Sequence, residues 1–238
     1  MINSYIAIDI ETTGLDPKKE KITEIGALRV QDGKAEAEFH TLVNPWRPIS
    51  ERIVELTGIT DEMVTGCPGV ESVIEELVDF CQELPLLGHR ILFDYSFLKK
   101  AAVNQGIKWE RDGVDTLTLC RAFMPGEESK TLSSACRFYH VDAGTSHRAL
   151  SDAYAAHFLY QELKKCYGAA EPERFAAKKL IYQVKREQPA SKRQKERLQE
   201  LLKYHKIKAP VQIDHLTRNE ASRLTDQILS KYGRIYRQ

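Results

Sequence analysis

Hydrophobic and polar residues alternate near the start of the chain, in the sequence YIAIDIETTGL that ends at Leu15. Alternation with period two is typical of a β-strand, because successive side chains point to opposite faces, and it predicts a strand over residues 4–11. One face of this strand carries three isoleucines: Ile6, Ile8 and Ile10. The other face places two acids, Asp9 and Glu11, near the strand end. Such carboxylates repel each other unless a cation lies nearby. The alternative is a solvated strand with an acidic exposed face.

The pattern over the rest of the first 170 residues predicts a mixed α/β sheet with helices on its faces. A hairpin signal at Asp32 and Gly33 joins the second expected strand to an antiparallel third, which completes a three-strand meander. Further strands are short and alternate with helices, which favours parallel pairing. The expected strands after the first cover residues 21–30, 37–45, 85–89 and 113–116. The expected helices cover residues 51–57, 61–64, 69–84, 93–106, 129–139 and 146–168, with another that begins at residue 116.

The chain from residue 172 onward shows helical spacing and no strand pattern. The expected helices cover residues 172–187, 191–206 and 217–233, and prolines at 189 and 210 separate them. This change predicts two domains: a mixed α/β domain over residues 1–167 and a small all-helical C-terminal module over residues 172–238.

Composition narrows the class of protein. Hydrophobic residues make up 42% of the chain and charged residues 29%, as in an ordinary soluble globular protein. Apolar runs stay well short of the roughly 20 residues that a membrane span needs, and we expect no signal peptide. The five cysteines are odd in number and lack zinc-knuckle spacing. Reduced thiols and a cytoplasmic location are therefore expected.

Charge is divided unevenly between the two parts. Residues 1–170 hold 18 Lys and Arg against 26 Asp and Glu, a net charge of −8, whereas residues 171–238 hold 17 against 8, a net charge of +9. A basic module favours contact with a polyanion such as nucleic acid. The alternative is a module that docks on the acidic domain of its own chain.

Two further stretches carry candidate chemistry. Asp94, in GHRILFDYSFL, lies at the start of an expected helix, where an aspartate is usually an N-cap, so that reading stays open. His147 and Asp152, in SHRALSDAYAAHF, are five residues apart, or about 140° around a helix axis. They converge only if His147 lies in the loop before the helix, with Thr145 or Ser146 as the cap. The alternative is a surface histidine at a helix start.

In this order, the motifs DIETTG, FDYSFL and HRALSD resemble those of the DEDDh family of 3′–5′ exonucleases. The likeness covers roughly residues 4–167 and is strongest to the proofreading epsilon subunit of bacterial DNA polymerase III and related stand-alone exonucleases. It implies a ribonuclease H-like fold. It also implies that four acids bind metal, Asp9, Glu11, Asp94 and Asp152, and that His147 acts as the general base.

The resemblance implies a two-metal mechanism with Mg²⁺ or Mn²⁺, which hard oxygen ligands select over softer metals. Asp9 would bridge both ions, with Glu11 and Asp152 on the ion that holds the attacking water. Asp94 would act on the second ion, and His147 would take the proton from the water.

Other residues are expected to contact the substrate or to have structural roles. The turn after the first strand offers three backbone N–H groups to the terminal nucleotide: Thr12, Thr13 and Gly14. The family likeness makes Leu15 and Ile59 candidate wedges against the terminal bases, although structural roles fit both equally well. Arg90 replaces the asparagine usual in the second motif, which leaves its substrate contact open. Asp115 is expected to cap a helix, and His40 shows no acidic partner in the sequence pattern.

The sequence therefore predicts a metal-dependent 3′–5′ exonuclease acting on single-stranded 3′ ends of DNA, or of RNA. Two alternatives remain: a non-catalytic nucleic-acid-binding or polymerase-associated adaptor, and an oligoribonuclease-like phosphodiesterase. The intact set of acids and His147 disfavours the adaptor, and activity on substrates of graded length separates the other two. A DNA polymerase or replication partner is a further expectation. The C-terminal module only loosely resembles helical modules of bacterial and phage proteins, and it fits nucleic-acid contact or protein docking.

Overall fold

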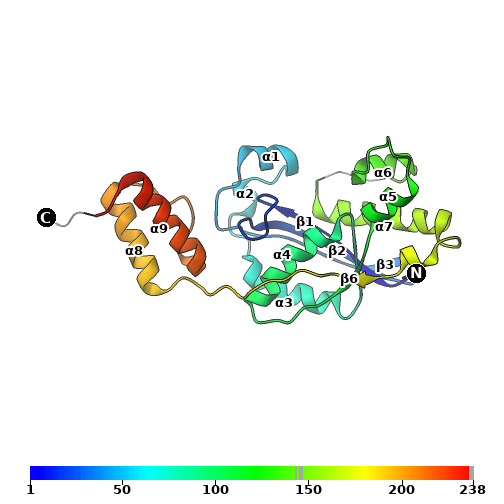
Figure 1. The fold of residues 1–238 in the computed structure, drawn as a ribbon, viewed down its shortest axis with the longest axis horizontal. Helices are drawn as coiled ribbons and strands as arrows, with labels where there is room; N and C mark the ends of the chain where they lie inside the picture. Colours follow the sequence, from blue (N-terminus) through cyan, green and yellow to red (C-terminus); the bar gives the residue numbers. More distant parts are fainter. Residues whose placement is uncertain (143, 145–146, 236–238) are drawn as a thin grey trace. The chain divides into compact units, whose positions relative to one another are not determined.

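The structure is a computed structural model of the chain, and it describes all residues except 143, 145–146 and 236–238. It divides into two compact units (Figure 1). The first comprises residues 1–45 and 49–184, and the second comprises residues 46–48 and 185–238. Among the described residues, no helix combines the length and the apolar character needed to cross a bilayer.

The first unit is built on a six-stranded mixed sheet with the order β3-β2-β1-β4-β5-β6. The first three strands pair antiparallel as the predicted meander, β4 and β5 run parallel to β1, and β6 pairs antiparallel with β5 at the edge. The mixed sheet predicted from the sequence is thereby confirmed. The strands are β1 (Tyr5–Thr12), β2 (Ile22–Gln31), β3 (Lys34–Leu42), β4 (Leu86–Gly88), β5 (Asp112–Asp115) and β6 (Lys178–Lys179).

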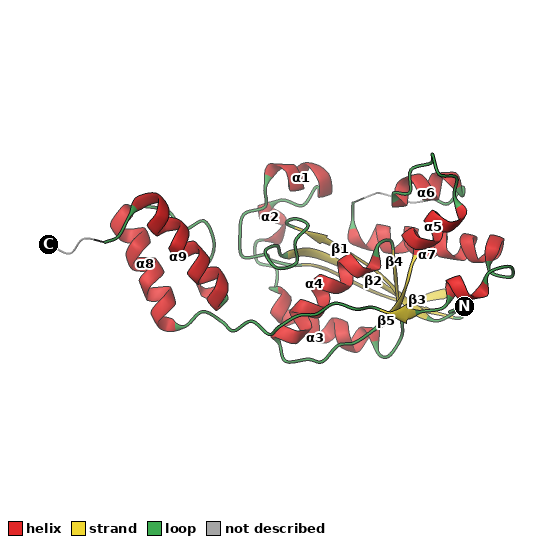
Figure 2. Ribbon diagram, viewed as in Figure 1, coloured by secondary structure: helices red, strands yellow, loops and turns green. Residues whose placement is uncertain are grey.

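Helices cover both faces of this sheet, and Figure 2 shows the strands between them. The isoleucine face of β1 packs on α3 and α4, in a core that includes Ile8, Leu77 and Tyr95. The opposite face packs on α7, in a core that includes Ala7 and Leu159. Both faces of β1 are therefore buried along most of its length. The helices of this unit are α1 (Glu51–Thr57), α2 (Asp61–Val64), α3 (Val70–Cys81), α4 (Ile91–Asn104), α5 (Thr116–Phe123), α6 (Leu132–Phe138), α7 (Ala149–Tyr167) and the 3₁₀ helix η1 (Pro172–Phe175).

The helix predicted over residues 172–187 is wrong. The chain there forms η1 and the short strand β6, and then runs on without regular structure. The reason is burial: Phe175 has no exposed surface, and Leu180 is 9% exposed within the core on the α3–α4 side. The Leu180 backbone N–H also donates to Arg111 O at 2.9 Å. Tertiary packing of the apolar residues thus overrides their helical spacing.

The second unit contains two of the three helices predicted for the C-terminal module, α8 (Lys192–His205) and α9 (Arg218–Tyr232), with the 3₁₀ helix η2 (Ile213–His215) between them. Each α-helix begins with a capping box, formed by Ser191 with Gln194 and by Thr217 with Glu220. A small core that includes Leu198 and Leu201 holds the pair together.

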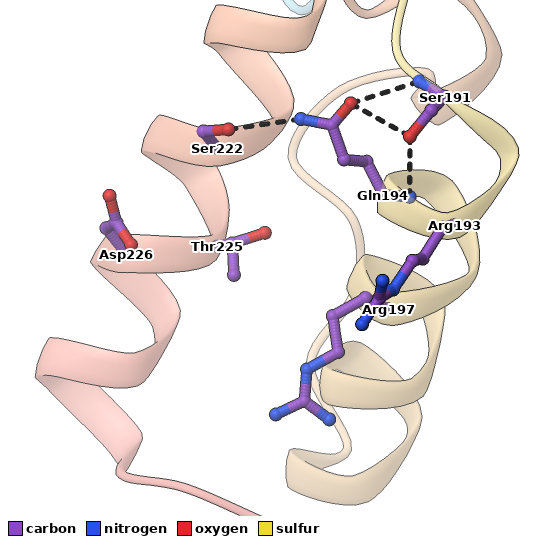
Figure 3. Close-up of a pocket in the computed structure, with 7 residues that line it drawn as sticks. All are labelled: Ser191, Arg193, Gln194, Arg197, Ser222, Thr225 and Asp226. Carbon is purple, nitrogen blue, oxygen red and sulfur yellow. Dashed lines mark hydrogen bonds between the residues drawn. The ribbon is translucent and has the colours of Figure 1, made fainter.

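A groove of about 240 Å³ lies between these helices (Figure 3). Gln194 crosses it, because its Nε2 donates to Ser222 Oγ at 3.1 Å while its Oε1 accepts from Ser191 N at 3.0 Å. The other lining residues are Arg193, Arg197, Thr225 and Asp226. The groove is therefore polar and carries two guanidinium groups against one carboxylate.

Candidate active site

The two acids of the first motif lie in the second half of β1, and β2 runs beside them. Asp9 is opposite Gly26 of β2, and Glu11 is opposite Glu24. The β1–β2 register shifts between Glu11 and Thr12, which marks the point where the strand leaves the ladder for the following turn. This side of β1 is the one that faces α7, since Ala7 packs in the α7 core.

Asp94 lies in the first turn of α4 and is only 3% exposed. It is not the N-cap of that helix, which is Arg90. Its Oδ1 instead accepts a hydrogen bond from the Ile10 backbone N–H of β1 at 3.1 Å. The pairing of β4 with β1 extends only as far as Ala7, and the Asp94 carboxylate bonds the strand beyond that point. This bond brings Asp94 to the strand segment that carries Asp9 and Glu11.

Asp152 and His147 approach from the start of α7. The helix begins at Ala149, so Asp152 lies in its first turn and His147 lies in the loop before it. The His147 backbone has φ 63°, and its N–H donates to Asp152 Oδ2 at 3.0 Å. The caps expected at residues 145 and 146 lie outside the described residues, and the observed N-cap position is Arg148.

The structure brings the predicted acids and His147 together at one place. Ligand atoms of Glu11, His147 and Asp152 lie within 4.8 Å of one another. The negative charges that raise the pKa of Asp9, after burial, are first Asp94 and Asp152 and then Glu11. Residues far apart in the sequence, on β1, α4 and α7, therefore share one cluster of carboxylates.

Burial is the largest cause of a raised pKa for each acid of the cluster. It raises the pKa of Asp9 and Asp94 well above the usual range, and it raises the pKa of Asp152 as well. The pKa of Glu11 rises to about 8, because of burial and then the charges of Asp152 and Glu24. Crowded carboxylates that resist ionisation in the protein alone are a donor set that fits a hard divalent cation. The residues thus fit the metal ions that the family motifs imply.

These shifts predict that, without divalent ions, the protein loses stability as the pH rises from about 5 to about 8. Below the ordinary glutamate pKa of 4.5, Glu11 is protonated in both the folded and the unfolded state. As the pH rises above 4.5, Glu11 ionises first in the unfolded state, so the folded state binds more protons than the unfolded state. The folded state therefore loses stability until the pH passes the pKa of Glu11 in the folded protein. Asp9, Asp94 and Asp152 act in the same direction.

The measurement is the melting temperature in EDTA as a function of pH, for wild type and for Glu11→Gln. The variant should show a flatter decline, and saturating Mn²⁺ should remove most of the decline in the wild type. Parallel curves for the two proteins in EDTA would contradict the raised pKa of Glu11.

The turn after β1 is held by its own hydrogen bonds. Thr12 Oγ1 donates to Gly14 O at 2.7 Å, and Thr13 Oγ1 donates to Glu20 Oε2 at 2.7 Å. The Thr13 backbone N–H donates to Lys21 O at 2.8 Å. Of the three N–H groups expected to meet a nucleotide, that of Thr13 is therefore already used within the protein.

The two expected wedge residues differ sharply in exposure. Leu15 is 77% exposed at the end of the turn. Ile59 has no exposed surface and packs with Ile49 and Val64 in a small cluster of the α1–α2 segment. An apolar side chain at Leu15 is available for contact with a base, whereas the burial of Ile59 argues against such a contact.

The second motif is joined to the neighbouring strand through Asp115. As predicted, Asp115 caps a helix: its Oδ1 accepts from Leu117 N, at the start of α5, at 2.9 Å. The same oxygen accepts from Arg90 N at 2.9 Å, and Arg90 has φ 72°. The Arg90 guanidinium lies 5.9 Å from the Phe93 ring centre. Asp115 thus fixes the backbone of the one residue that departs from the family motif.

Glu24 is a wholly buried carboxylate of β2 beside the cluster, and it is not among the site residues predicted from the sequence. Arg148 Nη2 donates to it at 2.8 Å, and His40 Nε2 lies 2.7 Å from the same oxygen. His40 therefore has an acidic partner that no pattern in the sequence indicated. The one sequence signal was an acid within a strand whose neighbouring residues are apolar or small, but its partners depend on strand register and on where α7 begins.

Known sequences resemble this chain over the segment that contains the carboxylate cluster. Residues 6–160, more than half of the chain, match the family described as Exonuclease. A PolC-type DNA polymerase III from Thermotoga petrophila is 39% identical over 151 residues, which are 63% of this chain and 11% of the polymerase. The corresponding protein of Bacillus subtilis is 33% identical over 164 residues, 68% of this chain and 11% of the polymerase. The chain thus spans only a small part of the length of these relatives.

Solved structures also resemble the chain. Exonuclease X in complex with 5′ overhanging duplex DNA is 27% identical, with a TM-score of 0.56 over 69% of this chain and 93% of that protein. A structure of exonuclease I matches with a TM-score of 0.62 at 17% identity, over 73% of this chain and 42% of that protein, and shows a shared fold. The ribonuclease H-like exonuclease fold expected from the motifs is therefore confirmed.

Proposed function

Because the chain belongs to the exonuclease family, we propose that it removes nucleotides from single-stranded 3′ ends by metal-dependent phosphodiester hydrolysis. The observation that carries this proposal is the carboxylate cluster of β1, α4 and α7, with the His147 imidazole within 4.8 Å of Glu11 and Asp152 ligand atoms. Structures of Exonuclease X and exonuclease I hold DNA, which favours DNA over RNA as the substrate.

We propose that the four acids hold two divalent ions, Mg²⁺ or Mn²⁺. Asp9, Glu11, Asp94 and Asp152 would hold these ions through their carboxylate oxygens. Bound ions of this kind neutralise phosphate charge and stabilise the leaving oxygen. The raised pKa values of the acids support this assignment, because bound cations offset both the burial and the mutual repulsion that disfavour the ionised carboxylates.

His147 is the proposed general base. It is exposed, so water and a nucleic acid end can reach it, and its neutral imidazole has a nitrogen that accepts a proton. The backbone N–H of His147 makes the hydrogen bond to Asp152, so the imidazole ring is not used in that bond. The side chain thus stands beside the acids while remaining open to solvent.

Leu15 is the proposed contact for the terminal base, because it is a large apolar side chain exposed in the turn that follows Glu11. The backbone of Thr12 and Gly14 is the proposed contact for the terminal nucleotide. Stacking or packing of a base on such a side chain tolerates any sequence, which suits an exonuclease.

A single assay tests the proposed activity against both rivals. Single-stranded DNA and RNA of graded length, labelled at the 5′ end, are incubated with Mg²⁺, Mn²⁺ or EDTA. Stepwise shortening of long DNA that stops in EDTA is expected. Binding without shortening would support an adaptor, and shortening confined to the shortest oligonucleotides would support an oligoribonuclease-like enzyme.

The second unit is proposed to hold the nucleic acid backbone. Residues 185–238 contain 14 Lys and Arg against 6 Asp and Glu, a net charge of +8. Arg193 and Arg197 lie one turn apart on α8 and line the groove toward α9, with hydroxyl groups of Ser222 and Thr225 opposite (Figure 3). Guanidinium and hydroxyl groups together are the donors that contact phosphate oxygens. A polymerase or another protein is the alternative partner of this unit.

Removing both arginines should therefore weaken binding to long single strands and reduce its salt dependence. Each lost phosphate contact lowers the slope of log affinity against log salt by about 0.7 for single strands, so the double variant should lose about 1.4. Affinity is measured across a salt series with Asp9→Asn in every protein to block cleavage. The control removes two arginine or lysine charges elsewhere on the unit, at Arg223 and Lys231. Equal slopes for the wild type and the groove variant would point to protein docking instead.

A further inference from the structure

Glu24 forms an unusually complete set of hydrogen bonds for a buried carboxylate outside the acid cluster. Its side chain is 0% exposed. Oε2 accepts from Ala149 N at 3.0 Å, and Oε1 accepts from Arg148 Nη2 at 2.8 Å and from Arg148 Nε at 3.1 Å. His40 Nε2 lies 2.7 Å from Oε1. A charge removed from water costs free energy unless it is paired and fully hydrogen-bonded, and Glu24 meets this condition.

These hydrogen bonds take the place of the side-chain cap that the start of α7 lacks. The N-cap residue of α7 is Arg148, which makes no side-chain cap hydrogen bond. The first N–H groups of a helix have no partner within it, and here the one of Ala149 is satisfied by a carboxylate from another element, β2. Glu24 therefore replaces a local cap and ties the first turn of α7 to the sheet.

Gly26, two residues further along the same face of β2, allows the close approach. A Cβ atom at this position would lie 2.1 Å from Leu150 N and 2.3 Å from Ala149 C, far inside van der Waals contact. The backbone of the first turn of α7 thus rests directly on β2. Two contacts therefore set the position of α7 along β2: the close approach at Gly26 and the hydrogen bonds of Glu24.

The anchored segment is the one that carries the reacting groups. His147 directly precedes Arg148, and Asp152 lies in the same first turn and accepts the His147 N–H. His147 also has φ 63°, a left-handed conformation that costs a non-glycine residue energy and persists only where its surroundings impose it. On the sheet side, Glu24 is the register partner of Glu11. The same pair of elements therefore carries the anchor and the acids.

We propose that the Glu24–Arg148 ion pair is a clamp that positions His147 against Glu11 and Asp152. Arg148 and Glu24 are positioning residues, which act through His147. The inference rests on the proposed function for its kinetic consequence, but the clamp itself has a structural readout that is independent of activity.

The kinetic test uses Arg148→Lys and Glu24→Gln. A lysine keeps the charge of Arg148 but offers no fork of two parallel donors, and a glutamine offers a single acceptor oxygen for several donors. Misplacing a reacting group by about 1 Å can cost about 10²-fold in rate, so kcat should fall by about that factor while KM changes little. The matched control is Glu110→Gln, which breaks the Lys99–Glu110 ion pair of 2.8 Å in the same unit and should leave kcat unchanged.

A double-variant comparison asks whether the clamp acts through His147. In a His147→Asn background, adding Arg148→Lys should cost no further activity, because the group that the clamp positions is already absent. A full additional loss of about 10²-fold would overturn the proposal, and so would near-wild-type kcat in Arg148→Lys and Glu24→Gln.

The second readout is backbone hydrogen exchange in the metal-free protein. Glu24→Gln should accelerate exchange of the Ala149 amide, and Glu110→Gln should not. An unchanged exchange rate would overturn the clamp whatever the enzyme does. Absence of hydrolysis in the wild type would instead refute the proposed function, and exchange would still decide whether the clamp exists.

Discussion

Replacing Asp9 with asparagine is expected to abolish hydrolysis and, in the absence of metal, to leave the protein at least as stable as wild type. Asp9 is the acid whose pKa is raised by burial and by all three other acids of the cluster. Asparagine removes the cost of burying and crowding an ionisable carboxyl group at this position, so no loss of folding stability follows in the metal-free protein. The same substitution removes one of the carboxylates proposed to hold the ions, so metal binding at the site should be lost.

The measurement is the melting temperature with and without Mn²⁺. A ligand present at about 100 times its dissociation constant adds about 2.7 kcal/mol to stability, which corresponds to a shift of roughly 5–10 °C for a domain of this size. Wild type should show this shift and Asp9→Asn should not. The control is Asp79→Asn, an exposed acid of α3 that should keep the full shift. Equal shifts in wild type and Asp9→Asn would remove Asp9 from the metal site.

Loss of the His147 imidazole is expected to lower the rate by about 10²–10⁴-fold, the usual contribution of a general base. The substitution chosen is His147→Asn, because asparagine tolerates the left-handed backbone that His147 adopts and cannot act as a base.

The matched control is His140→Asn, which replaces another exposed histidine with positive φ in the same unit and should keep the wild-type rate. The shift of melting temperature with Mn²⁺ then separates two roles for His147, since its imidazole nitrogen lies within 4.8 Å of the Glu11 and Asp152 oxygens. If His147 is only a base, the His147→Asn variant keeps the increase in melting temperature on adding Mn²⁺. A variant with wild-type rate would exclude His147 as the base, and a variant without the shift would make it a ligand.

Short-range patterns in the sequence account for most of what could be predicted. Alternation defined the buried strand that carries Asp9 and Glu11, and the five-residue spacing of His147 and Asp152 required a loop before a helix. These features depend only on side-chain direction within one element, which a local pattern specifies. The resemblance of three motifs to one family then indicated that β1, α4 and the start of α7 meet at one site. No local pattern specifies that arrangement.

The surroundings of Glu24 could not be predicted because they depend on three elements at once. Its partner across the ladder depends on the β1–β2 register, and Arg148 reaches it only because Gly26 lets α7 begin directly above β2. The helix prediction for residues 172–187 failed for a related reason. The apolar spacing of this segment suits a helix, but Phe175 and Leu180 are already taken up by the two cores of the first unit.

The two-residue strand β6 has a consequence for anyone who isolates the catalytic unit. It pairs with Asp112 and Gly113 of β5, which is otherwise the last strand of the sheet on that side. An uncovered strand edge offers unpaired backbone groups to other chains and is a recognised cause of aggregation. A fragment cut at residue 167 would lose both β6 and Phe175, exposing apolar core beside an open edge. A fragment that ends at Val184 keeps the edge covered, and it is the one expected to remain monodisperse at high concentration.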